Sequence, residues 1–191
     1  MCYRIFYRQV IQINREPTSL NKVYAVPIGK NFLKNIFMSQ INIINLAVDI
    51  VEKAYELKNK FTDATNAPVN YACVFCQNDD EYDELKKLSG EIGKVIEDTP
   101  SGPLYHVKPI DTVAGQLKLL KIRNPDTTKP ERGDADFTVS NYPEFKNKYL
   151  QQDKFKLIPR PTFEMIELMD SNFNVRAYFS YPPLDKQLGI N

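Results

Sequence analysis

The chain has 191 residues, enough for one or two domains with a proper hydrophobic core. Charged residues make up 26% and hydrophobic residues 42%, and the net charge of +1 argues against a nucleic-acid-binding protein, which is usually clearly basic. No apolar run approaches the roughly 20 residues of a membrane span, and residues 1–30 lack the apolar core of a signal peptide. We therefore expect a cytoplasmic protein without nucleic-acid or membrane partners.

Residues 1–30 form a poorly defined N-terminal segment. They hold five basic residues and one acid, show no clear period, and are interrupted by Pro17 and Pro27. Met38 then precedes a more regular stretch. The segment is either an adapter strand or the result of a misplaced gene start, and the sequence leaves both open.

Residues 31–67 are predicted to be helical. Apolar side chains recur at steps of three and four from Leu33 to Tyr55, with charged residues mostly between them. Ser39 is a candidate N-cap for a second helix within this stretch. The polar sequence TDATNAPVN then forms a linker.

Two later stretches share one pattern, which we interpret as an internal duplication. Asn78 and Asn141, 63 residues apart, each precede a Glu by three positions, the capping-box arrangement that begins a helix. Each follows an alternating strand and precedes three more strands, with Pro and Gly at nearly every boundary. The sequence thus predicts two βαβββ modules, residues 70–123 and 134–181, in a domain spanning 68–191. The alternative is two unrelated α+β stretches that look alike.

Paired βαβββ modules resemble the vicinal oxygen chelate superfamily, which contains glyoxalase, bleomycin-resistance and dihydroxybiphenyl dioxygenase proteins. The sequence DSNFNVRA, residues 170–177, is similar to the D-P-D-G-N phrase that members often carry before the last strand, although its Pro and Gly are missing. The N-terminal helices, followed by a strand and DDEYDEL, further resemble the YecM-like branch. The resemblance covers residues 68–183 and implies an α+β, glyoxalase-like fold of two tandem modules preceded by a helical segment.

In the metal-dependent members, a His or Glu on the first and last strand of each module binds one divalent cation in the cleft between modules. The resemblance places these positions at Tyr71 and Asp134, and at Ala177 with Leu120 or Lys121 as its counterpart. Only Asp134 is a good ligand, because alanine has no donor atom and a lysine ammonium repels the cation. The resemblance therefore implies an incomplete ligand set and no cofactor, with Asp134 as the metal ligand if there is one.

Asp134, Asp136 and Thr138 fall on one face of an alternating strand, so we expect them to face the cleft while the residues between them face the helix. Two like charges on one face need a basic partner, a bound proton or solvent. The basic partners expected nearby are Lys121, Arg123 and Arg132. One interpretation is a structural ion-pair network at the module interface. The other is an altered polar pocket, whose candidate ligand-binding residues are Tyr71, Lys121, Arg123, Asp134 and Asp136.

Three other residues that could carry chemistry are given structural interpretations. Cys73 and Cys76 spell C-x-x-C, but residues three apart in a strand point to opposite faces and no second pair follows, so both are expected to be small buried side chains. His106 is the only histidine and lies mid-strand without a nucleophile motif nearby. No glycine-rich nucleotide loop occurs either. The sequence names no catalytic residue.

Two functions remain open. The first is a metal-free protein that binds a small molecule or a protein partner without turnover, as a monomer or homodimer. The second is a metal-dependent lyase, isomerase or dioxygenase with atypical ligands. Loss of at least two of the four ligand positions favours the first, and the fold alone decides neither chemistry.

Overall fold

The structure is a computed structural model that describes the backbone of residues 30–190 and the side chains of residues 42–190. The predictions for residues 1–29 therefore lie outside the described residues. Both βαβββ modules and the buried residues of the hydrophobic core belong to the compact unit that begins at Ser39. None of the helices within residues 30–190 is long and apolar enough to cross a membrane.

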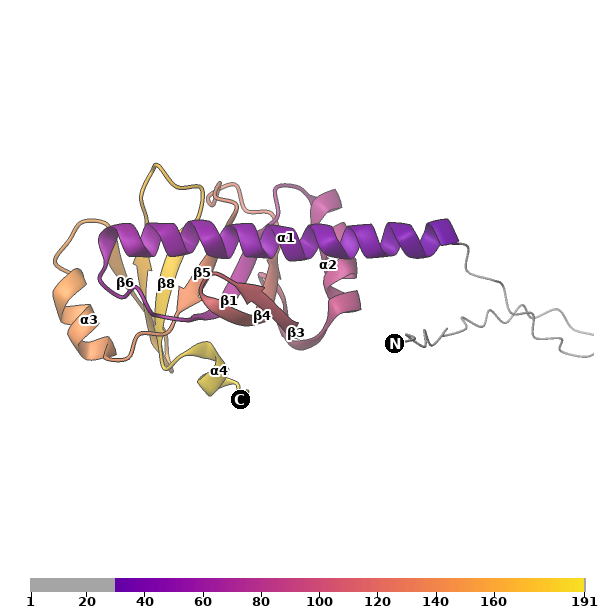
Figure 1. Cartoon of the computed structure of the whole chain (residues 1–191). Helices are drawn as coiled ribbons and strands as arrows, with labels where there is room; N and C mark the ends of the chain where they lie inside the picture. The colour runs from indigo at the N-terminus through magenta and orange to yellow at the C-terminus, as the bar shows by residue number, and fades with distance from the viewer. Residues whose placement is uncertain (1–29, 191) are drawn as a thin grey trace, which may run out of the picture. The chain divides into compact units, whose positions relative to one another are not determined.

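Two βαβββ modules follow one another along the chain, as the sequence predicts (Figure 1). The first consists of β1 (Val69–Phe75), α2 (Asp79–Ile92), β2 (Gly93–Thr99), β3 (Gly102–Thr112) and β4 (Gly115–Arg123). The second consists of β5 (Gly133–Phe137), α3 (Tyr142–Tyr149), β6 (Phe155–Pro159), β7 (Glu164–Leu168) and β8 (Arg176–Tyr181). Helix α1 (Lys30–Phe61) precedes the modules and the short helix α4 (Leu184–Gln187) follows them.

The modules join through their first strands into one sheet of eight strands, in the order β2-β3-β4-β1-β5-β8-β7-β6. Within each module the first and last strands are parallel, whereas β1 and β5 are antiparallel. Tyr71 lies opposite Asp136, and Cys73 lies opposite Asp134. With the offset of 63 residues between the modules, Tyr71 corresponds to Asp134, and Cys73 corresponds to Asp136.

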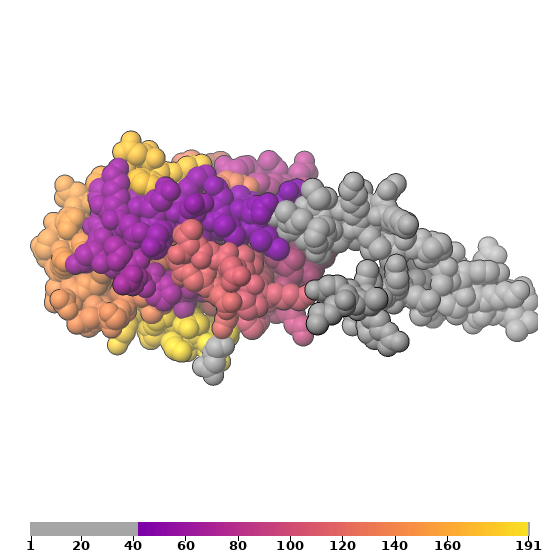
Figure 2. Space-filling view, in the orientation of Figure 1, coloured from indigo at the N-terminus to yellow at the C-terminus, as the bar shows by residue number. Residues whose placement is uncertain are grey.

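Alternation along the strands divides the sheet into an apolar face and a polar face. The apolar face belongs to the hydrophobic core and includes Ala72, Val74, Leu120, Ile122, Ala135, Phe137, Ala177 and Phe179. Buried α1 residues of the same core are Ile43, Ala47, Ile50, Val51, Ala54 and Leu57. The space-filling view shows this side of the molecule, where α1 lies against segments of both modules (Figure 2). Helix α1 thus spans the junction between the modules.

The two predicted helix caps are both present. The Asn78 side chain accepts a hydrogen bond from the Glu81 backbone N–H at 2.9 Å, and that of Asn141 accepts one from the Glu144 backbone N–H at 3.3 Å. Each cap satisfies one of the amide groups that the first turn of a helix leaves without an intrahelical partner. The repeated Asn-x-x-Glu pattern therefore sets the start of both module helices.

The predicted second helix after Ser39 is wrong. Helix α1 runs without interruption from Lys30 to Phe61, so Ser39 lies inside it. The physical reason is that this stretch contains neither Gly nor Pro, and its apolar period continues on both sides of the serine.

A substitution at Gly133, the first residue of β5, tests how tightly α1 packs against the junction between the two modules. A Cβ atom there would lie 2.8 Å from Ile50 Cδ1 and would collide with the Cys73 carbonyl oxygen. We therefore expect Gly133→Ala to lower the free energy of unfolding by about 1–3 kcal/mol through overpacking. The control is Gly90→Ala in α2, where no heavy atom lies within 4 Å of the new Cβ and a gain of up to about 1 kcal/mol is expected. Urea denaturation measures both, and equal stability of Gly133→Ala and wild type would contradict this packing.

Candidate functional site

The polar face of the sheet borders a cavity of about 450 Å³ between the two modules. Its lining includes residues of β1, β4, β5, β7, β8, α4 and the connecting loops. All five residues that the sequence proposes for a polar pocket lie in this lining, namely Tyr71, Lys121, Arg123, Asp134 and Asp136. Three different strands bring them together, β1, β4 and β5.

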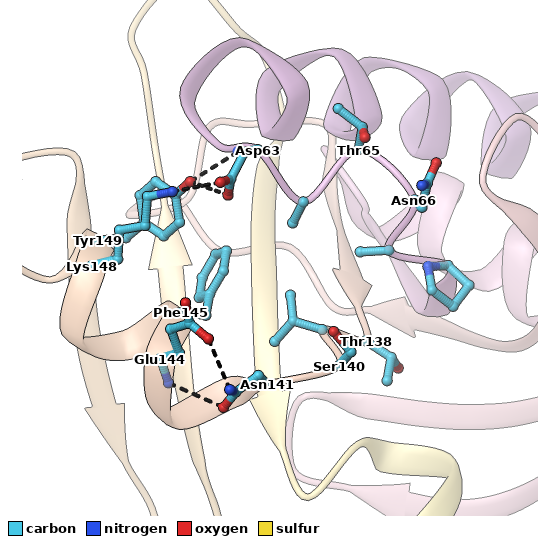
Figure 3. Close-up of a pocket in the computed structure, with 14 residues that line it drawn as sticks. Asp63, Thr65, Asn66, Thr138, Ser140, Asn141, Glu144, Phe145, Lys148 and Tyr149 are labelled. Atoms are coloured by element: carbon cyan, nitrogen blue, oxygen red, sulfur yellow. Dashed lines mark hydrogen bonds and ion pairs between the residues drawn. The ribbon is translucent and has the colours of Figure 1, made fainter.

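A second cavity of about 590 Å³ lies between residues 63–68 and the start of α3 (Figure 3). Part of its polar lining is internally bonded: Asp63 accepts hydrogen bonds from Tyr149 Oη at 2.5 Å and Lys148 Nζ at 2.5 Å, and Asn141 Nδ2 donates to Glu144 at 2.9 Å. Thr138 lines this cavity rather than the cleft, because β5 already ends at Phe137 and the alternation stops there. The prediction that Thr138 faces the cleft is therefore wrong, and the candidate site is the cavity between the modules.

The predicted last-strand ligand position is also wrong by one residue. Ala177 pairs with Ala135 on the apolar face and is fully buried in the core, as is Leu120. Because side chains alternate along a strand, a shift of one residue moves a position to the opposite face. On β8 the residues that line the cavity are Tyr178 and Ser180.

The residues at the inward-facing positions do not fit a divalent cation. Tyr71 and Asp134 occupy the first strands, and Lys121 and Tyr178 occupy the last strands. Asp134 alone is a carboxylate, and the lysine ammonium opposes a second positive charge. Across residues 42–190, no group of three His, Cys, Asp or Glu side chains is placed to hold a metal ion.

Asp134 is buried, with 6% of its surface exposed, and its Oδ1 has no hydrogen-bond partner among the described residues. Burial raises the pKa of this carboxyl to about 8, and the neighbouring Asp136 adds to the shift. Lys129 and Arg123 act in the opposite direction but do not offset the loss of solvation. Asp134 is therefore mostly neutral at pH 7.

Asp136 differs from Asp134 because it has a local partner. Its carboxylate accepts hydrogen bonds from the Ser180 backbone N–H at 3.2 Å and from the Ser180 hydroxyl. Burial raises its pKa to about 6, and the two Ser180 bonds limit that shift. One carboxyl of the pair is thus held by β8, whereas the other keeps a free oxygen.

The cationic residues of the cavity do not pair with the two aspartates. Lys121 Nζ donates to Thr99 Oγ1 at 2.7 Å, and Arg123 bonds Asp126 at 2.9 Å. Lys129, which the sequence did not single out, also lines the cavity. Burial lowers the pKa of both lysines, and neither makes an ion pair within the described part of the chain. The predicted partner Arg132 instead pairs with Glu81 at 2.5 Å, so that prediction is wrong.

A structural ion-pair network does exist, but around Arg176 rather than the two aspartates. Arg176 bonds Glu167 at 2.8 Å and both Glu131 oxygens at 2.8 Å, and Tyr178 Oη also donates to Glu167. The network ties β8 to β7 and to the connection between the modules. Only alternation along β8 could have indicated that Arg176 and Tyr178 share a face.

The structural interpretations of the cysteines are confirmed. Cys73 and Cys76 are both buried and carry free thiols. Cys76 belongs to the hydrophobic core, whereas Cys73 lies on the polar face, where it influences the pKa of Tyr71. Burial raises the pKa of both thiols, which disfavours the reactive thiolate form.

Comparison with known proteins gives similarity in structure but not in sequence. No family model matches the chain, and no curated protein matches it. A structural-genomics protein, EC4020, is similar with a TM-score of 0.57 and 11% identity, over 82% of this chain and 91% of that chain. A glyoxalase/bleomycin resistance protein/dioxygenase superfamily member from Vibrio splendidus 12B01 gives a TM-score of 0.41 and 9% identity, over 60% and 97% of the two chains.

The chain has the glyoxalase-like fold. Two βαβββ modules joined through their first strands are the architecture that the resemblance to the vicinal oxygen chelate superfamily implies. At 11% identity, the similarity to EC4020 speaks for the fold alone. The finer resemblance to a YecM-like branch stays a prediction. The two modules border a cavity, and the positions that the resemblance assigns to metal ligands do not carry a full set of donors.

The buried Asp134 predicts an unusual dependence of stability on pH. The folded state keeps a proton that the unfolded chain, with a pKa near 3.8, releases, so the free energy of unfolding should fall between about pH 4 and pH 8. Each unit of difference in pKa corresponds to about 1.4 kcal/mol. Asp134→Asn should flatten this slope and exceed wild type in stability at about pH 8.

The exposed Asp153→Asn is the matched control and should keep the wild-type slope. Urea denaturation at about pH 5 and pH 8 measures all three proteins. If Asp134→Asn keeps the same slope as wild type, the carboxyl is not protonated in the folded state.

The ligand positions predict that the purified protein retains no stoichiometric Zn, Ni, Fe or Mn, because Lys121 and Tyr178 replace the expected donors. Elemental analysis after purification without chelator measures this directly. One equivalent of metal, lost on Asp134→Ala but kept in Asp153→Ala, would overturn the prediction.

Proposed function

We propose that the protein binds a small molecule, without a metal ion, in the cavity between its two modules. The observation that supports this is the buried Asp134 Oδ1, which has no partner among the described residues. An unsatisfied buried polar group costs about 1–3 kcal/mol. A molecule that fills the cavity can form the missing hydrogen bond with this oxygen. That hydrogen bond would add to the affinity of a ligand with matching chemistry.

The size and lining of the cavity support the same proposal. Its volume of about 450 Å³ falls within the roughly 300–1,000 Å³ of small-molecule sites. Such sites combine apolar and aromatic side chains with placed polar groups, and this lining holds eight of the former beside eleven polar or charged residues. The apolar and aromatic side chains of this lining are Tyr71, Phe75, Leu104, Ile158, Phe163, Met165, Tyr178 and Leu184.

The alternative is the metal-dependent lyase, isomerase or dioxygenase that the superfamily resemblance also allows. It requires several donor side chains to converge on one ion. No observation within residues 42–190 favours such a set. We therefore keep binding without turnover as the proposed function, with the carboxyls as recognition groups.

A bulky side chain inside the cavity tests the proposal. Met165 on β7 lines the cavity, whereas Met169, just beyond the same strand, is exposed and lies outside the lining. In a thermal-shift screen of small metabolites with EDTA present, we expect hits that stabilise wild type and Met169→Trp. The same compounds should lose their effect on Met165→Trp, because the indole fills the space.

Two results would contradict the proposal. Compounds that shift both tryptophan variants equally bind elsewhere on the surface. Compounds that act only with an added divalent cation would favour the enzyme alternative.

A further inference from the structure

We infer that the ligand of this cavity is an organic acid, with its carboxylate beside Lys121, Arg123 and Lys129 and its apolar body toward β6 and β7. The inference rests on the proposed function, because it names the class of molecule that this cavity would take. It is carried by three features of the lining: a group of cations that includes two lysines without an ion pair among the described residues, a carboxyl with a free oxygen, and an apolar wall on the other side.

The first feature is a group of cations on the β4 side. Lys121 and Arg123 lie on β4, and Lys129 lies in the connection that follows it. The two lysines make no ion pair within the described residues, and Arg123 Nε is buried without a hydrogen-bond partner. An anion between these groups would gain charge-assisted hydrogen bonds from donors that are already partly desolvated.

The second feature is Asp134. Lys129 and Arg123 act electrostatically to lower its pKa, but it makes no ion pair with either of them. Because it retains its proton near neutral pH, it offers an O–H donor instead of a negative charge. A carboxylic acid held neutral in this way can donate to an anionic oxygen. Asp134 therefore complements an acid rather than repelling it.

The third feature is the apolar wall on the β6–β7 side. Ile158 and Met165 lie on the paired strands β6 and β7, and Phe163 lies in the turn between them. Strands β4 and β7 are on opposite sides of the central β1–β5 pair, so charged and apolar walls are separated. Arg160 is the one cation on the apolar side, and its side chain is exposed.

An amine ligand fits this arrangement less well. Its ammonium would have to lie among Lys121, Arg123 and Lys129. Of the other carboxyls in the lining, Asp136 already accepts two bonds from Ser180, and Glu97 is exposed. The titratable or charged groups that interact with Asp134 come from several elements: Tyr71, Cys73, Lys121, Arg123, Lys129, Asp136, Arg176 and Tyr178. Cations predominate among those that face the cavity.

Matched compounds that differ only in the head group provide the test. Isothermal titration calorimetry would compare an acid, an amine and an alcohol on each of three bodies: butyl, isopentyl and phenylbutyl. We expect the acids to bind at least about tenfold more tightly than the alcohols of the same body, and the amines not to bind.

Three variants assign the contacts. Lys121→Met should weaken acid binding at least about tenfold, whereas Lys118→Met, on the same strand but outside the lining, should bind as wild type. Asp134→Asn keeps a donor without a titrating group, so it should retain acid binding at about pH 6.5. It should also bind the acid more tightly than wild type at about pH 8.5, where Asp134 ionises and repels the ligand.

The outcomes separate this inference from the proposed function. If amines bind more tightly than acids and Asp134→Asn abolishes their binding, the cavity binds cations and the inference is wrong while the proposed function stands. If acids bind no better than alcohols on all three bodies, or bind equally well to Lys121→Met, the inference fails in the same way. If Met165→Trp leaves the affinity of every compound unchanged, the proposed function fails as well.

Discussion

The antiparallel pairing of β1 with β5 is the constraint on which the rest of the structure depends. It is where two four-stranded modules become one sheet of eight strands, and α1 covers it on the apolar face. The same register places Tyr71 opposite Asp136 and Cys73 opposite Asp134. Four polar or polarisable side chains thus meet at the centre of the opposite face, where the cavity forms.

This position accounts for the different states of the two aspartates. Both are withdrawn from water, and burial is the main reason that the pKa of each rises. Asp136 recovers part of the lost solvation through two hydrogen bonds from Ser180, whereas Asp134 has no such partner among the described residues. A charged residue nearby is not enough to ionise a buried carboxyl, because its attraction must exceed the cost of desolvation.

Much of the fold could be predicted from the sequence because its signals are local. The Asn-x-x-Glu caps, the Gly and Pro boundaries and the strand alternation depend on neighbouring residues, and they give both modules and the shared face of Asp134 and Asp136. Predictions that depended on exact register or on distant partners were less reliable. Ala177 was assigned one position away from the cavity-facing residue, and Arg132 pairs with Glu81 across the fold instead of with an aspartate. The roles of Lys129, Arg176 and Ser180 depend on contacts between distant segments, which no local pattern records.

The cavity presents the neutral carboxyl of Asp134 beside two lysines without ion pairs among the described residues and beside Arg123, whose Nε has no hydrogen-bond partner there. The most direct measurement is a pH titration of the Asp134 side-chain carbon by NMR on protein with ¹³C-labelled aspartate, assigned with Asp134→Asn. This resonance is expected to titrate with a midpoint near pH 8, so that the Asp134 carboxyl is protonated at pH 7. A midpoint at or below about pH 4, the value of an ordinary aspartate, would show a charged carboxylate in the cavity and contradict the account.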